Sequence, residues 1–419
     1  MRPAWSNPAL VDLECSACGA VIELEPLHPT CPRCGKPVWA RYDLAGVGRR
    51  WKRDDLGRAD QGLWRYRAVL PFAEDFRAVR LGEGGTPLIP LQRLERELGV
   101  QNLWLKEESA NPTHSFKARG LALAVNGAAA LGKRAIALPS AGNAGSAAAA
   151  YAAAAGLRCR ITVPEDTPEA FILEQKALGA EVLLVPGTIA EAGKALAEWA
   201  PEPEWWNVAT FKEPFRLEGK KTLGYEIAEQ TGWQLPTCIF YPTGGGTGLV
   251  GMWRAFIELR ELGWIHDGPP RLVAVQSAGC APVVRAFDAG DRTISPWLNA
   301  RTLASGLQVP SPFADALILR SIRETMGSAV AVSEEELLDG MSDLTRVGGC
   351  LACPEGGATL AALRRLRARG EVSGEDRVVI FNTGSGLKYA EAWRQALLRA
   401  RPPGEPGMSD ATRGRGEKA

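Results

Sequence analysis

The sequence predicts an α/β protein built on doubly wound parallel sheets. From about Gly82 onward, short apolar runs alternate with helical segments, the pattern of parallel strands joined by covering helices. Of the 419 residues, 46% are apolar and 23% are charged, the balance of a soluble globular chain that can bury a large core. The 46 glycines indicate tight turns or close approach of the backbone to a ligand.

The expected elements follow one another in a strand–helix order. Apolar, β-branched runs such as RCRITVP predict strands at 135–139, 158–164, 181–186, 238–242, 271–276 and 377–382. Alanine-rich or amphipathic stretches between them predict helices at 145–156, 168–179, 189–199, 221–232, 249–262, 334–347 and 358–369. Residues 401–419 are rich in proline, glycine and charge, and we expect a disordered tail there.

Charge and hydropathy exclude several classes of protein. The formal net charge of +1 provides no bulk basic field, so we expect no nucleic-acid partner and no anionic membrane surface as partner. The first residues lack the apolar segment of a secretory signal, and the alanine-rich run at 146–157 is too short to span a bilayer. We therefore expect a cytoplasmic protein.

Residues 1–45 differ from the rest because they are rich in proline and cysteine. Two CxxCG motifs, separated by twelve residues, supply four thiolates that suit a tetrahedral structural zinc ion: Cys15, Cys18, Cys31 and Cys34. The alternatives are unligated thiols, iron, or a zinc-ribbon binding module. Cys350 and Cys353 have no partner pair, and we interpret them as two buried thiols.

A glycine-rich loop follows the strand at 238–242 and opens a helix. Backbone amides at such a helix start form an anion site, to which a threonine hydroxyl adds a donor; the residues are Gly244, Gly245, Gly246, Thr247 and Gly248. The loop also contains G-x-G-x-x-G, which would fit a dinucleotide-dependent oxidoreductase. The next strand ends in Gln-Ser-Ala-Gly and lacks the acidic residue that such a site needs. A phosphate monoester is therefore favoured.

A lysine, an asparagine and a hydroxyl group complete this candidate site. Lys117 lies at a predicted helix start near Phe116, where the helix dipole disfavours its charged form; Ser115 or Thr113 could cap that helix. Asn143 and Thr383 follow two other expected strands, so they meet at the same sheet edge. An amine, an amide, a phosphate loop and a hydroxyl together are what pyridoxal phosphate needs.

Five motifs, in order and spacing, resemble those of the threonine synthases, among the tryptophan-synthase-β-like (fold type II) pyridoxal-phosphate enzymes: NPTHSFKARG, PSAGNAG, EPFRLEGKKT, PTGGGTG and NTGSGLK. The resemblance implies a Schiff base at Lys117, a ring-oxygen donor at Asn143, and a phosphate loop at 244–248. It implies that Thr383 meets the pyridine nitrogen, with Ser385 as the alternative. It also implies a zinc-ribbon-like segment (1–45), a large domain (46–119 and 207–400) and a small mobile domain (120–206).

The resemblance implies conversion of the small-molecule substrate O-phospho-L-homoserine, with water, to L-threonine and phosphate by a homodimer. Ser140 to Ala144 would receive the substrate carboxylate, Arg216 its phosphate, and Ser115 would reach substrate or cofactor. His114 and Lys220 stand where many relatives have glycine and glutamine, which concerns substrate recognition. A cysteate-synthase-like enzyme and a threonine or serine dehydratase therefore stay open as alternatives.

Overall fold

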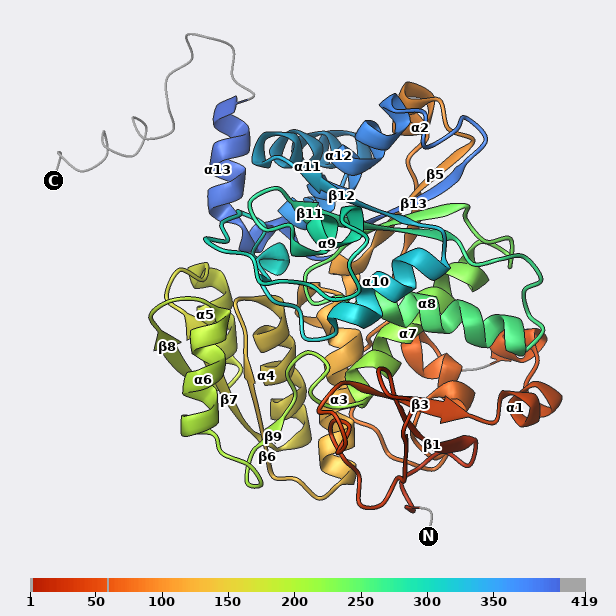
Figure 1. Cartoon of the computed structure of the whole chain (residues 1–419), viewed down its shortest axis with the longest axis vertical. Coiled ribbons are helices and arrows are strands. Elements are labelled where there is room, and N and C mark those ends of the chain that lie inside the picture. Colours follow the sequence, from red (N-terminus) through yellow and green to blue (C-terminus); the bar gives the residue numbers. More distant parts are fainter. Residues whose placement is uncertain (1–2, 59, 400–419) are drawn as a thin grey trace, which may run out of the picture.

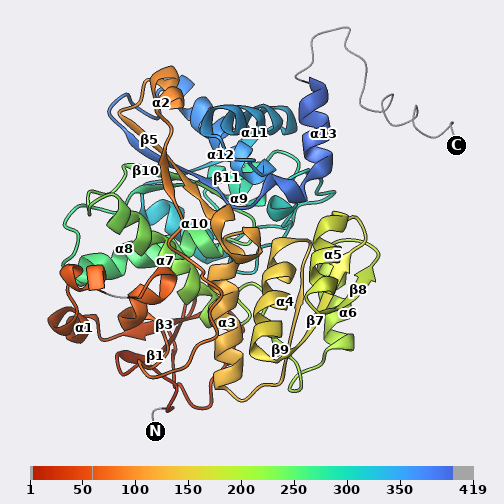
Figure 2. The same cartoon turned by 180° about the vertical axis from the view of Figure 1, so that it is seen from behind.

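The computed structural model describes residues 3–58 and 60–399, which form three sheets. The predicted tail at 401–419 lies outside these residues. Figure 1 shows two α/β units side by side, with the N-terminal segment against the larger one, and Figure 2 shows the same arrangement from behind. Within the described residues, none of the helices combines the length and the apolar content that a membrane span requires.

The N-terminal segment is a small antiparallel sheet followed by a short helix. Strand β1 (Leu10–Cys15) pairs with β2 (Val21–Ile22) on one side and with β3 (Val38–Tyr42) on the other. Helix α1 (Leu44–Arg50) is capped by Asp43, whose carboxylate accepts a hydrogen bond from the Gly46 amide. This segment packs on the larger unit, since Trp39 lies edge-on to Trp253 at a centroid distance of 6.0 Å.

The larger unit contains a six-stranded sheet in the order β12-β11-β10-β13-β5-β4. Neighbouring strands are parallel except for the edge strand β4, which runs antiparallel to β5. The bounds are β4 Leu88–Pro90, β5 Asn102–Glu107, β10 Cys238–Pro242, β11 Arg271–Ser277, β12 Ser328–Val332 and β13 Arg377–Asn382. The predicted parallel sheet is confirmed, with one antiparallel strand added at its edge.

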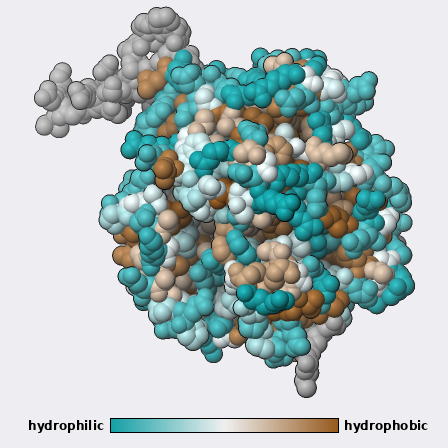
Figure 3. Space-filling view, viewed as in Figure 1, coloured by the Kyte–Doolittle hydropathy of each residue, from teal (hydrophilic) through white to brown (hydrophobic). Residues whose placement is uncertain are grey.

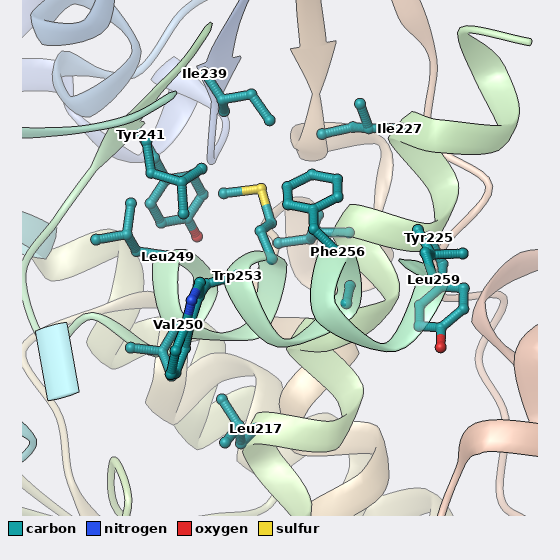
Figure 4. Packing of buried hydrophobic residues seen from close by; sticks show 14 of the residues in the cluster. Leu217, Tyr225, Ile227, Ile239, Tyr241, Leu249, Val250, Trp253, Phe256 and Leu259 are labelled. Atoms are coloured by element: carbon teal, nitrogen blue, oxygen red, sulfur yellow. The ribbon is translucent and has the colours of Figure 1, made fainter. Parts of the chain in front are cut away.

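Both faces of this sheet are covered, because successive side chains of a strand point to opposite sides. Ile239 and Tyr241 of β10 pack in one buried cluster, which Figure 4 shows around α8, whereas Phe240 packs in a second cluster. The first face carries α7 Phe215–Gln230, α8 Thr247–Glu261 and α10 Asp315–Glu324. The second face carries α2 Gln92–Leu98, α11 Glu334–Gly348, α12 Pro354–Ala368 and α13 Ala390–Arg399. The unit is therefore doubly wound, as predicted.

The smaller unit has a four-stranded parallel sheet in the order β8-β7-β6-β9. Its strands are β6 Ala135–Pro139, β7 Arg158–Pro164, β8 Glu181–Val185 and β9 Trp206–Asn207. Ile136 and Leu138 face α3 (Lys117–Ala130) and α4 (Asn143–Ala155), and Ala135 and Ala137 face α6 (Ile189–Trp199). Helix α5 (Glu169–Ala177) lies beside α4.

The largest differences from the sequence-based boundaries occur at helix starts. Helix α7 begins at Phe215, six residues before the predicted start, and α12 begins at Pro354, four residues early. Proline and glycine at or beside these helix starts, Pro214 and Gly219 for α7 and the sequence PEGG for α12, obscured the helical pattern. The prediction that Ser115 or Thr113 caps α3 is wrong: the N-cap residue is Phe116, without a side-chain cap, and the Thr113 hydroxyl donates to the Pro112 carbonyl.

The face in Figure 3 is mostly hydrophilic, with scattered hydrophobic groups.

Candidate active site

A cavity of about 370 Å³ is lined by residues that follow the carboxyl ends of β6, β10 and β13. These are the ends at which open parallel sheets bind ligands. The predicted residues that line it are Lys117, Ser140, Asn143, Ala144, Gly244, Gly245, Gly246, Thr247, Gly248 and Thr383. The structure therefore brings together the lysine, the amide, the glycine loop and the hydroxyl from four separate parts of the chain.

Lys117 is the first residue of α3 and lies against this cavity, with protein around the rest of its side chain. Its pKa is lowered to about 7, first by burial and then by the Arg216 cation, and the Glu355 carboxylate opposes both effects. The preceding segment is joined to the last strand of the sheet, because the Phe116 amide donates to the Thr383 carbonyl over 3.1 Å. The backbone before Lys117 is thus fixed to the sheet, and with a pKa of about 7 the amine is close to half neutral near pH 7.

The glycine loop packs too tightly against the protein to admit side chains at several positions. Helix α8 starts at Thr247, and its N-cap Gly246 has a φ of 79°, which favours glycine. A Cβ added at Gly244 would overlap the Gly306 carbonyl, and one added at Gly248 would overlap the Tyr241 ring. The loop thus brings free helix-start amides to the cavity wall, the arrangement that binds anions.

The two polar groups predicted to contact a cofactor ring differ in exposure. Thr383 is buried, and its hydroxyl lies 3.9 Å from the Cys353 sulfur. Asn143 is half-buried at the start of α4. Ser385, the alternative to Thr383, does not line the cavity, and its hydroxyl accepts a hydrogen bond from the Leu387 amide. The geometry therefore favours Thr383 over Ser385.

The predicted substrate residues are divided between the cavity wall and the protein interior. Ser140 lines the cavity, but its hydroxyl oxygen already accepts from the Gly145 amide over 2.8 Å. Ser115 is buried, and its hydroxyl has no hydrogen-bond partner among the described residues. His114 is exposed, with a φ of 51°, and does not line the cavity. It therefore occupies the turn before Lys117.

Arg216 is only 1% exposed and lies behind the cavity wall. Its Nη1 donates to the Val208 carbonyl over 2.7 Å, whereas Nε and Nη2 have no partner in the part of the chain that the structure describes. Burial lowers its pKa to about 10, and burial raises that of Glu213 to about 7, although Arg216 opposes this rise. The guanidinium keeps two unused donors close enough to Lys117 to lower its pKa.

Sequence reasoning missed a carboxylate in the cavity wall, that of Glu355. Its Oε1 accepts from the Gly306 amide over 2.8 Å and from the Tyr389 hydroxyl over 2.9 Å. Its Oε2 has no partner within residues 3–58 and 60–399. Residues 305–313, which also line the cavity, were missed as well. The sequence feature that could have pointed to Glu355 is its position directly after Pro354, where an acidic residue suits the first turn of a helix.

The four predicted metal ligands lie together in the N-terminal segment. The sulfur atoms of Cys15, Cys18, Cys31 and Cys34 all lie within 4.8 Å of one another, with Cys15 to Cys34 at 3.4 Å and Cys18 to Cys31 at 3.7 Å. Tetrahedral zinc bonds of about 2.3 Å place sulfur atoms about 3.8 Å apart. The donor set and its spacing therefore fit one such ion.

Comparisons with known proteins agree with this arrangement. A profile of the family described as pyridoxal-phosphate dependent enzyme matches residues 79–384. A threonine synthase from Methanocaldococcus jannaschii is 33% identical over 90% of this chain and 93% of that protein. A threonine synthase from Halalkalibacterium halodurans is 35% identical over 78% of this chain and 89% of that protein.

Solved structures share the fold. A threonine deaminase isoform from Solanum lycopersicum matches with a TM-score of 0.65 at 21% identity, over 76% of this chain and 88% of that chain. Diaminopropionate ammonia lyase from Escherichia coli matches with a TM-score of 0.66 at 19% identity, over 77% of this chain and 89% of that chain. At these identities the likeness concerns the fold alone.

Proposed function

This chain belongs to the threonine synthases, within the family of pyridoxal-phosphate-dependent enzymes, and we propose that it converts O-phospho-L-homoserine and water to L-threonine and phosphate at the cavity around Lys117. It is a lyase of amino-acid biosynthesis with the α/β type II fold. One observation carries the residue assignments: a lysine with a pKa of about 7 shares a cavity with a glycine loop whose packing leaves no room for a Cβ atom at Gly244, Gly246 or Gly248.

The cavity fits pyridoxal 5′-phosphate in charge and in shape. Lys117 would hold the cofactor covalently, the amides of 244–248 would bind its phosphate, Asn143 would donate to its ring oxygen, and Thr383 would meet its ring nitrogen. The bound cofactor supplies an electron sink for negative charge that develops on the substrate carbons. A hydroxyl at Thr383 makes the ring less electron-withdrawing than a carboxylate partner does.

In the proposed reaction, Lys117 also acts as the general acid and base. A general acid or base works best when its pKa lies near the operating pH, and the pKa of about 7 meets that condition. With the cofactor bound, the free Lys117 amine would take one proton from Cα and one from Cβ as the γ-phosphate leaves. It would return one proton at Cγ and one at Cα, while water adds its hydroxyl group at Cβ. Burial and the Arg216 charge keep this amine neutral often enough to act as the base.

The remaining residues position the substrate. The start of α4, at Ser140 to Ala144, offers backbone amides to the substrate carboxylate, which suits the positive end of a helix. Arg216 does not line the cavity, but its unpartnered Nε and Nη2 donors support a role in pairing with the departing phosphate. Ser115 contributes its free hydroxyl to substrate or cofactor. Residues 120–206 form a small domain that closes over the substrate and excludes stray water.

Three further properties belong to the proposal. The four clustered thiols hold a structural zinc ion, as their spacing supports. The enzyme is cytoplasmic, which the absence of disulfides among the cysteines that the structure describes supports. The enzyme is a homodimer, in line with the family resemblance.

The test is phosphate release from O-phosphohomoserine by the holoenzyme, with the amino-acid product identified. We expect threonine in step with phosphate, and no turnover by Lys117→Ala. The proposal fails if the holoenzyme binds its cofactor but turns over phosphoserine, serine or threonine instead. Retained turnover by Lys117→Ala would overturn the assignment of the lysine.

A further inference from the structure

Lys388 is a buried cation that no step described above uses. It ends the short helix η6 (Gly386–Lys388), which directly follows the loop of Thr383. Its ammonium lies 2.6 Å from Glu174 Oε2, 2.8 Å from the Thr113 carbonyl oxygen and 3.4 Å from Asn143 Oδ1. One cation therefore joins three segments that are far apart in the sequence.

These segments come from both α/β units. Glu174 lies on α5 and Asn143 begins α4, both in the smaller unit, whereas Lys388 follows β13 of the larger sheet. Figures 1 and 2 both show the start of α13 next to α5. The Glu174–Lys388 ion pair thus crosses from one unit to the other beside Asn143, which lines the cavity.

The ammonium fixes the orientation of the Asn143 amide. An amide presents an acceptor on one side and two donors on the other. The Asn143 oxygen faces the Lys388 cation, and a flipped amide would place its own N–H groups against that cation. The Tyr389 hydroxyl favours the same amide orientation. It donates its proton to Glu355 Oε1 over 2.9 Å and therefore acts as acceptor toward Asn143 Nδ2, at 3.4 Å.

We propose that Lys388 is a positioning residue, held by Glu174, that turns the donor side of the Asn143 amide toward the cofactor in the cavity. This inference rests on the proposed role of Asn143 toward the ring oxygen of pyridoxal phosphate. Lys388 touches neither cofactor nor substrate and acts through Asn143. Glu174 keeps the ammonium in place and ties the orientation of the amide to the contact between the two units.

The test measures the affinity of the cofactor-free protein for pyridoxal phosphate by absorbance titration, together with the absorbance maximum of the bound cofactor. Lys388→Met keeps an unbranched side chain only one atom shorter and removes the charge. We expect roughly tenfold weaker binding, the equivalent of one lost polar contact to a charged group, and a shifted maximum. Lys388→Arg keeps the wild-type affinity and absorbance maximum. Glu174→Gln weakens cofactor binding less than Lys388→Met does, because the Lys388 amine remains. Lys194→Met, at an exposed lysine, serves as the matched control and changes neither value.

A double-mutant cycle with Asn143→Ala separates positioning from general stability. If Lys388 acts through Asn143, then Lys388→Met adds little loss of affinity in the Asn143→Ala background. Equal losses in both backgrounds, or wild-type binding by Lys388→Met, would overturn the inference and leave the role of Asn143 standing. Wild-type binding by Asn143→Ala would overturn that role, and the inference with it.

Discussion

Lys117 and Lys220 contact the same aromatic ring: their amino nitrogens lie 4.4 Å and 3.8 Å from the centroid of Phe116. The Lys220 amine also donates to the Phe116 carbonyl, next to the Lys117 peptide. Burial lowers both pKa values, that of Lys117 to about 7 and that of Lys220 well below 10.5. A charged Lys117 lowers the pKa of Lys220 further. The site therefore keeps two amines in a region that disfavours their charged forms.

Replacing Lys117 by methionine should stabilise the cofactor-free protein. The pKa of Lys117 is about 7 in the folded chain and 10.5 in the unfolded chain, so folding releases a proton between about pH 7 and pH 10.5, and below pH 7 the folded protein holds the charged amine at a cost. This cost is largest below pH 7 and vanishes above pH 10.5. We expect a gain of about 3 kcal/mol at pH 7, after allowing for water in the cavity. Urea unfolding at pH 7 and pH 10.5 measures it. A gain that grows with pH would contradict the prediction.

Arg216 and Glu355 should shift the pKa of Lys117 in opposite directions. The Arg216 cation lowers this pKa and the Glu355 carboxylate raises it. We therefore expect Arg216→Gln to move the midpoint above 7 and Glu355→Gln to move it below 7. The pH dependence of reductive methylation at Lys117, followed by mass spectrometry in the cofactor-free protein, reports the midpoint. Shifts of the same sign in both variants would show that the two charges do not act on the amine.

Gly248→Ala should disrupt the phosphate loop. The added methyl group would overlap the buried Tyr241 ring, which packs between Phe116 and Phe381 at centroid distances of 5.9 and 4.9 Å. Because the ring cannot move without displacing its neighbours, we expect a loss of about 1–3 kcal/mol in stability and weaker cofactor binding. Gly268→Ala is the control, since a Cβ there meets no atom within 4 Å. Equal thermal midpoints for the two variants would contradict the prediction.

Several strands of the two parallel sheets were predictable because they are buried on both faces. Continuous apolar runs bounded by turns gave the limits of β6, β7, β10 and β13 correctly. The cavity followed from the same pattern, since the polar loops after these strands meet at one edge. Lys117, Asn143 and Thr383 were therefore brought together by topology alone.

Other parts of the site left no periodic signal. The segment around the start of α7 reads EPFRLEGKK (213–221), in which charged side chains stand at positions that the fold buries, so its helical period is hidden. Glu355 and the loop at 305–313 reach the cavity through tertiary packing, which residue spacing does not encode. The interior position of Arg216, behind the cavity wall, has the same origin.

Loss of the metal should loosen the N-terminal segment and weaken its contact with α7. Cys15 ends β1 opposite Val38 of β3, and at the other end of β3 the Tyr42 hydroxyl donates to Glu218 of α7 over 2.8 Å. We expect about one zinc ion per chain in the wild type. Cys31→Ser should lose that metal and show faster hydrogen exchange over residues 10–42, with partial loss of activity because α7 also carries Arg216. Cys350→Ser, at a cysteine outside the cluster, should keep the metal. A metal-free wild-type protein with slow exchange over residues 10–42 would show that packing alone holds this segment.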